Sequence, residues 1–70
     1  MIGLGSKYRH ELIVNTRDGQ AFRGIYWGAP GQVLRLRQAR MLEPDGPVPM
    51  DGEVVIFKSQ ILFIQKLLTE

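Results

Sequence analysis

The sequence predicts a single all-β domain, a small and strongly bent antiparallel barrel of five strands. Short runs of β-branched and aromatic residues are separated by glycine- and proline-containing turns, which is typical of strands joined by hairpins. Leu34 and Leu36 alternate with Arg35 and Arg37, the period of two expected of a strand with one buried face. The chain of 70 residues has no internal repeat and no pattern of a long helix, so one compact domain is expected.

The first two strands are expected over residues 10–16 and 20–27. Alternation places Leu12, Val14 and Thr16 on one face of the first strand. Asp18-Gly19 between the strands predicts a tight hairpin turn, because such turns require positive φ angles. Gly24 lies in the middle of the second strand, where glycine marks a sharp bend or a close approach of two backbones.

The third strand is expected over residues 32–42, after the turn formed by Gly28-Ala29-Pro30-Gly31. Residues 43–52 contain three prolines and two glycines, so the whole stretch is interpreted as a variable loop. Its acidic residues make it a poor contact for phosphate; they are Glu43, Asp45 and Asp51.

The last two strands are expected over residues 53–58 and 61–65, although one long bent strand is an alternative. Their apolar runs do not alternate with polar residues, which indicates cover on both faces. A chain of this length has little material to cover both faces of two strands. Neighbouring copies of the chain are therefore expected to supply the missing cover. Phe57, Leu62 and Ile64 are placed at a subunit seam; in the alternative of a monomer, they pack under an N-terminal arm, residues 1–9.

Composition excludes several classes of function. The chain has no cysteine and a single histidine, His10, so neither a disulfide nor a metal cluster is expected. It contains no nucleophile paired with a base and no phosphate-binding glycine-rich loop, so we expect no catalytic residues and no cofactor. No apolar run is long enough to span a membrane, and a cytoplasmic protein is expected. The net charge of +2 does not by itself indicate nucleic acid.

Three segments together resemble the Sm-like family, which includes the LSm and Hfq types. The first segment resembles the first Sm motif and reads Val14-Asn15-Thr16-Arg17-Asp18-Gly19-Gln20-Ala21-Phe22-Arg23-Gly24. The second segment is similar to the third strand of that motif and reads Leu34-Arg35-Leu36-Arg37-Gln38-Ala39. The stretch from Ile56 to Gln65 is similar to the second Sm motif. The resemblance implies a five-stranded barrel, residues 10–66, with an N-terminal helix that is short or absent here. It also implies a homo-oligomeric ring of six or seven copies.

The resemblance further implies that the turn Lys58-Ser59-Gln60 lines the pore of such a ring. Copies of Lys58 would form a basic ring for single-stranded RNA, and Gln60 and Gln32 could hydrogen-bond base edges. Trp27 is a candidate for base stacking, with packing at the rim as the alternative. Arg23, Arg35 and Arg37 form a basic stripe on the outer face, either solvated or in contact with phosphates.

The sequence also departs from the family. The loop of residues 28–32 has neither the Asp nor the Asn that uridine-binding Sm proteins carry there, and Phe57-Lys58 replaces the usual Arg-Gly of the second motif. Two hypotheses therefore stay open. One is a non-catalytic RNA-binding ring. The other is a structural or protein-interaction module, of phage or bacterial origin, that keeps the barrel and has lost RNA binding.

Overall fold

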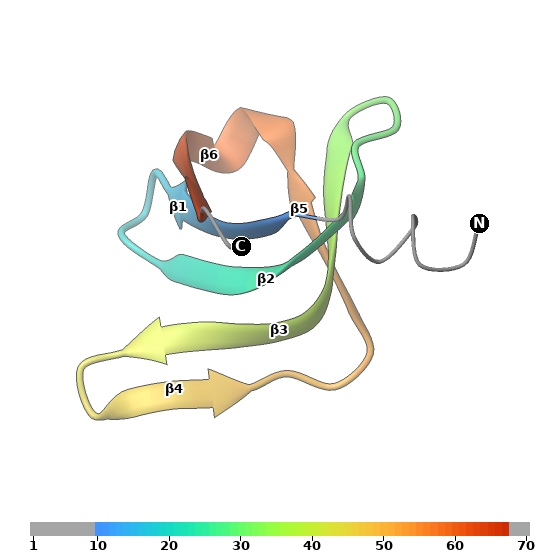
Figure 1. Ribbon diagram of the computed structural model, residues 1–70. Helices are drawn as coiled ribbons and strands as arrows, with labels where there is room; N and C mark the ends of the chain where they lie inside the picture. Colours follow the sequence, from blue (N-terminus) through green and yellow to red (C-terminus); the bar gives the residue numbers. More distant parts are fainter. Residues whose placement is uncertain (1–9, 68–70) are drawn as a thin grey trace.

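The structure is a computed structural model that describes residues 10–67. These residues form six antiparallel strands and one turn of 3-10 helix (Figure 1). The predicted arm over residues 1–9, with an N-terminal helix expected to be short or absent, lies outside the described residues. In chain order the elements are β1 (Glu11–Thr16), β2 (Ala21–Gly28), β3 (Val33–Glu43), β4 (Gly46–Pro49), β5 (Glu53–Phe57), η1 (Lys58–Gln60) and β6 (Ile61–Leu67).

The strands form one sheet in the order β4-β3-β2-β1-β6, and β5 pairs with β3 next to β4. All pairings are antiparallel, and the sheet curls strongly enough to enclose its own core (Figure 1). Two register shifts interrupt the β2–β3 pairing, one of them at Gly24. Shifts of this kind bend and twist a strand, which small barrels require. The predicted all-β, strongly bent antiparallel fold is confirmed.

The core is built from alternate residues of the strands. Val14 and Leu36 are fully buried, and the predicted inward face of β1 is buried along its whole length. Leu34 and Leu36 point inward while Arg35 and Arg37 point outward, as their alternation predicts. The buried hydrophobic residues are Leu12, Val14, Leu34, Leu36, Ala39 and Ile56.

The turn between β1 and β2 forms where Asp18-Gly19 predicts it. Gly19 has a φ of +88°, and its N–H donates to the Thr16 carbonyl at 3.1 Å. The buried Thr16 hydroxyl donates to Asp18 Oδ1 at 2.5 Å and accepts from the Gln20 N–H at 3.1 Å. A buried hydroxyl needs such partners, because an unsatisfied one would cost about 1–3 kcal/mol.

The interpretation of residues 43–52 as a loop is wrong for residues 46–49. This segment is β4, which forms a hairpin with the end of β3 through pairs such as Met41 with Val48. Pro47 and Pro49 are compatible with the hairpin because they occupy alternate positions. The N–H groups that face β3 are those of Gly46, Val48 and Met50, and the two prolines stand between these positions. The fold therefore has one strand more than expected.

At the C-terminal end, two strands form rather than one long bent strand, because η1 separates β5 from β6. Among the described strands, β5 pairs only with β3 and β6 only with β1. Each therefore keeps one edge without a strand partner. The exposed fractions of Phe57, Leu62 and Ile64 on these two strands are 60%, 58% and 45%.

Candidate nucleic-acid interface

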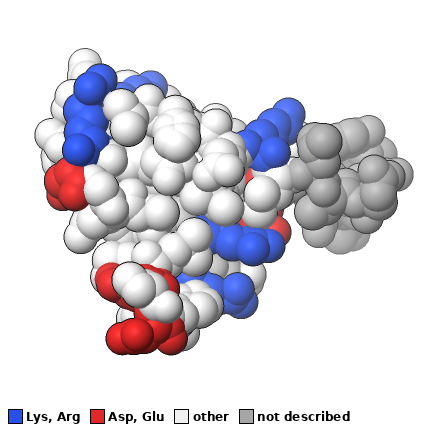
Figure 2. All heavy atoms as spheres, turned by 90° about the vertical axis from the view of Figure 1, so that its left-hand side faces the viewer, with Lys and Arg blue, Asp and Glu red and all other residues white. Residues whose placement is uncertain are grey.

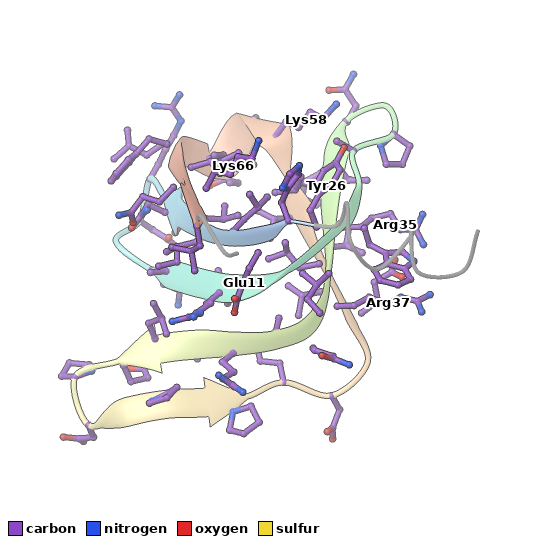
Figure 3. The ribbon with its side chains drawn as sticks, in the orientation of Figure 1. Glu11, Tyr26, Arg35, Arg37, Lys58 and Lys66 are labelled. Carbon is purple, nitrogen blue, oxygen red and sulfur yellow. The ribbon has the colours of Figure 1, made fainter. Side chains whose placement is uncertain are left out.

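The turn η1 is held at its first residue by the loop between β2 and β3. The Lys58 N–H donates to the Gln32 carbonyl at 2.8 Å. The Lys58 ammonium donates to the Ala29 carbonyl at 2.9 Å, and Figure 3 shows this side chain extending toward the loop. The structure therefore brings together Lys58 and Gln32, two residues that the sequence singled out for RNA binding.

The other end of η1 is held by the β1–β2 turn. The Arg17 N–H donates to the Gln60 carbonyl at 2.8 Å, and Arg17 Nε donates to the Ser59 carbonyl at 3.0 Å. Arg17 is exposed and was missed by the sequence analysis. It stands 42 positions from Ser59 in the chain, and no linear pattern connects the two.

We call the set Arg17, Gln32, Lys58, Ser59 and Gln60 the η1 surface. All five residues are exposed. An arginine carries five N–H donors and a lysine ammonium three. Since each cation here gives one donor to a backbone carbonyl, both keep further donors for an anionic ligand. The carbonyl contacts restrict where the two charges point, so they are partly organised before any ligand binds.

Trp27 is placed outside the contacts that assemble the η1 surface. It lies near the end of β2 and is half-buried. The guanidinium carbon of Arg37 lies 4.4 Å from the centre of its ring, a cation–π contact. Arg37 Nε in turn lies 3.3 Å from Glu53 Oε1. Trp27 therefore belongs to a packed cluster on the outer face of the barrel.

Carboxylates neutralise part of the predicted basic stripe on that outer face. Glu53 accepts from Arg35 Nε at 2.6 Å and Arg35 Nη2 at 3.0 Å, and Glu11 accepts from Arg23 Nε at 2.8 Å. The hydrogen bonds from Arg35 and Arg37 lower the pKa of Glu53, and the bond from Arg23 lowers that of Glu11. Both carboxylates are thus held in the charged form, which leaves the outer face less attractive to phosphate than the η1 surface.

Two acidic side chains lie at the opposite end of the molecule, whereas Asp18 adjoins Arg17 at the η1 end. Glu43 and Asp45 lie at the turn of the β3–β4 hairpin, and both are exposed. Figure 2 shows one group of acidic side chains at the lower end of the face that it presents and another at the left edge, beside basic side chains. The turn η1 lies at the other end of the fold (Figure 1). The η1 end carries two cations, Arg17 and Lys58, against one carboxylate, Asp18, and this balance favours it over the hairpin turn for a polyanion.

The predicted seam residues lie on the two strands with free edges, together with two apolar residues that the sequence analysis did not select. Val55 on β5 is 51% exposed and Phe63 on β6 is 49% exposed. A groove of about 330 Å³ runs between β5 and the β1–β2 turn, with Val54, Val55, Ile56 and Phe57 along one wall. The only signal for Val55 and Phe63 was their membership in the same apolar runs.

The direction of the backbone amides on β5 and β6 follows from the hydrogen bonds around them. Lys58 donates to Gln32 of the neighbouring strand's loop, and N–H groups alternate in direction along an antiparallel strand. For β6 the direction follows from β1. The Tyr26 N–H donates to the His10 carbonyl, so the even-numbered residues of β1 face β2 and the odd-numbered ones face β6. The outward N–H groups are those of Glu53, Val55 and Phe57 on β5, and of Ile64 and Lys66 on β6, beyond the register shift at Leu62.

Other classes of site find no support in the described part of the chain. Residues 10–67 contain no group of three or more His, Asp and Glu side chains that could hold a metal ion. Within the same range no helix has the length and apolar character needed to cross a membrane.

Comparison with known proteins addresses the fold directly. No protein-family model matches the sequence, and no curated protein matches it. A solved structure does match: the crystal structure of a heptameric archaeal Sm protein, discussed for its implications for the eukaryotic snRNP core. The TM-score is 0.77 over 97% of this chain and 100% of the archaeal chain, at 22% sequence identity. The chain has an Sm-like fold. In this Sm-like barrel, η1 and the β2–β3 loop are joined directly by Lys58.

Proposed function

We propose that this Sm-like barrel assembles into a closed ring and binds single-stranded RNA through its η1 surface, without catalysis. The observation that carries the proposal is the joining of Arg17, Lys58 and Gln32 around one exposed turn. The likeness to a heptameric Sm protein supports the ring.

The ring rests on the two free edges. The outward amides of β5 and β6 have no strand partner among the described residues, and apolar side chains beside them are about half exposed. An exposed apolar edge is a template for pairing with another chain. Pairing β5 of one copy with β6 of the next uses two different surfaces, and such a heterologous contact closes into a ring when its rotation allows.

RNA binding rests on repetition of the η1 surface. Each copy contributes Arg17 and Lys58, so a ring of six or seven copies would present a band of cations despite the small net charge per chain. Gln32, Ser59 and Gln60 add hydrogen-bonding groups that can reach sugars or base edges. Trp27 remains a stacking candidate on the outer side, where Arg37 already covers one face of its ring.

A second candidate is a structural or protein-interaction module with the same ring and no RNA. The composition of the β2–β3 loop favours this reading, because Ala29, Pro30 and Gly31 offer no polar side chain to read a base. The seam is common to both candidates, so only a binding measurement separates them.

The test is a titration of the purified protein with short U-rich and A-rich RNA oligonucleotides over a series of salt concentrations. Binding should weaken with salt, because phosphate contacts release counterions. Lys58→Ala and Arg17→Ala should each weaken it and reduce the salt slope, whereas Arg40→Ala should not. Arg40 is an exposed cation at the hairpin end of β3 and serves as the matched control. No binding at low salt would refute RNA binding and leave the interaction module.

A further inference from the structure

The free edge on the far side of β3 has two halves of different chemistry. β4 and β5 pair with the same side of β3, β4 opposite residues 40–43 and β5 opposite residues 33–37. Their outer sides therefore follow each other along one edge of the sheet (Figure 1). Both halves carry exposed apolar side chains: Val48 on β4 is 45% exposed, and Val55 on β5 is 51% exposed.

The two halves differ in the hydrogen bonds that they can offer. Along β5 the outward N–H groups have no strand partner among residues 10–67. Along β4 the Met50 N–H donates inward to the Ala39 carbonyl at 2.9 Å, so Val48 and Gly46 also face β3 and residues 47 and 49 face outward. Both of these outward positions are proline, which has no N–H to donate.

We propose that Pro47 and Pro49 close the β4 half of this edge to strand pairing, so that a second copy of the chain can pair only along β5. Prolines on an edge strand prevent another strand from adding to it. Both outward positions of β4 are proline, so no outward N–H along this strand is left to pair with an added strand. The excluded occupant is β6 of another copy, because β6 is proline-free and has a free edge of its own.

This inference does not depend on RNA binding or on ring closure. Without the prolines, the hairpin would offer an apolar edge strand on every copy, and copies would join through a second contact that continues beyond a closed assembly. The prolines are therefore specificity determinants of assembly: they define which half of the edge another copy can use.

The test replaces both prolines by a strand-forming residue, Pro47→Val with Pro49→Val. We expect the solution mass by light scattering to rise at least twofold above that of the parent, increasing with protein concentration. The amides newly introduced at positions 47 and 49 should be protected from hydrogen exchange in the associated form. Pro44→Val is the matched control, because Pro44 lies in the hairpin turn and not on the edge.

A double variant with the mass of the parent and unprotected new amides would overturn the proposal. If the double variant does not fold, Pro47→Val and Pro49→Val are measured singly, and each should still exceed the mass of Pro44→Val. The parent itself supplies a further check: the Val48 amide should exchange at least about tenfold more slowly than the Asp45 amide. Rapid exchange at Val48 would refute the inward direction on which the inference rests. If the parent protein is a monomer, the proposed ring is refuted. The double proline variant is still expected to have at least twice the solution mass of the parent.

Discussion

Gly24 lies where β2 passes close to β3, and a single added methyl group tests this contact. A Cβ atom built on Gly24 would lie 3.1 Å from both Cα and Cβ of Ala39 and 3.2 Å from the Arg37 carbonyl oxygen. These distances are shorter than ordinary van der Waals contacts. Two of the three atoms belong to the backbone of β3, so they cannot rotate away as the end of a flexible side chain would.

The expected cost follows from two opposing effects. Forcing an extra methyl group into a well-packed site costs about 1–3 kcal/mol. Replacing glycine by alanine also restricts the unfolded chain, which offsets about 0.4–1 kcal/mol. The net expectation for Gly24→Ala is a loss of about 1–2 kcal/mol, or roughly 4–16 °C in melting temperature for a domain of this size. Gly24→Val should cost more, because it adds two further methyl groups.

Thermal and urea unfolding at a fixed protein concentration measure this loss; fixed concentration matters because association adds to apparent stability. A double-mutant cycle with Ala39→Gly supplies the control. Removing the Ala39 methyl group takes away one of the three close contacts, so the two substitutions should couple favourably by about 0.5–1 kcal/mol. An unchanged melting temperature for Gly24→Ala, or strictly additive effects in the cycle, would refute the close approach.

Two further predictions concern assembly and pH. Phe57→Asp or Leu62→Asp should lower the solution mass from several chains toward one. Val48→Asp makes the same change of charge at an exposed apolar residue away from the seam and should not lower it. An unchanged mass for both seam variants would place the seam elsewhere. Stability should fall as the pH drops below about 4.5, because Glu11 and Glu53 have lowered pKa values in the folded state and their ion pairs are lost when they are protonated. Urea unfolding at pH 7 and pH 3 measures this effect, and Glu53→Gln should reduce the difference; equal differences in variant and parent would contradict the role of that carboxylate.

Local patterns predicted much of the barrel because they reflect local physics. The alternation through Leu34 and Leu36 follows from the two-residue period of a strand, and Asp18-Gly19 is read directly as a turn. The same local patterns gave a wrong prediction for β4, because prolines lower the expectation of a strand and residues 46–49 were interpreted as a loop. Whether a proline is tolerated depends on which way its nitrogen faces, and only the pairing register of β3 with β4 decides that.

The residues of the candidate site likewise fall into those found from the sequence and those found only from the fold. Lys58 and Gln32 were identified through a family resemblance, whereas Arg17 entered only when folding placed it against Ser59. The pairing of Glu53 with Arg35 and Arg37 likewise depends on the register of β5 on β3. That register changes the outer face from a basic stripe into a partly neutralised one.

By itself, then, the sequence determined the strand faces, the hairpin turn and the excess of apolar surface near the C-terminus, since each depends on residues a few positions apart. Only the tertiary structure decided which edges stay open, which cations stay free of carboxylates and which side chains meet at η1. Those features depend on register and on contacts between residues far apart in the chain, which no local pattern encodes.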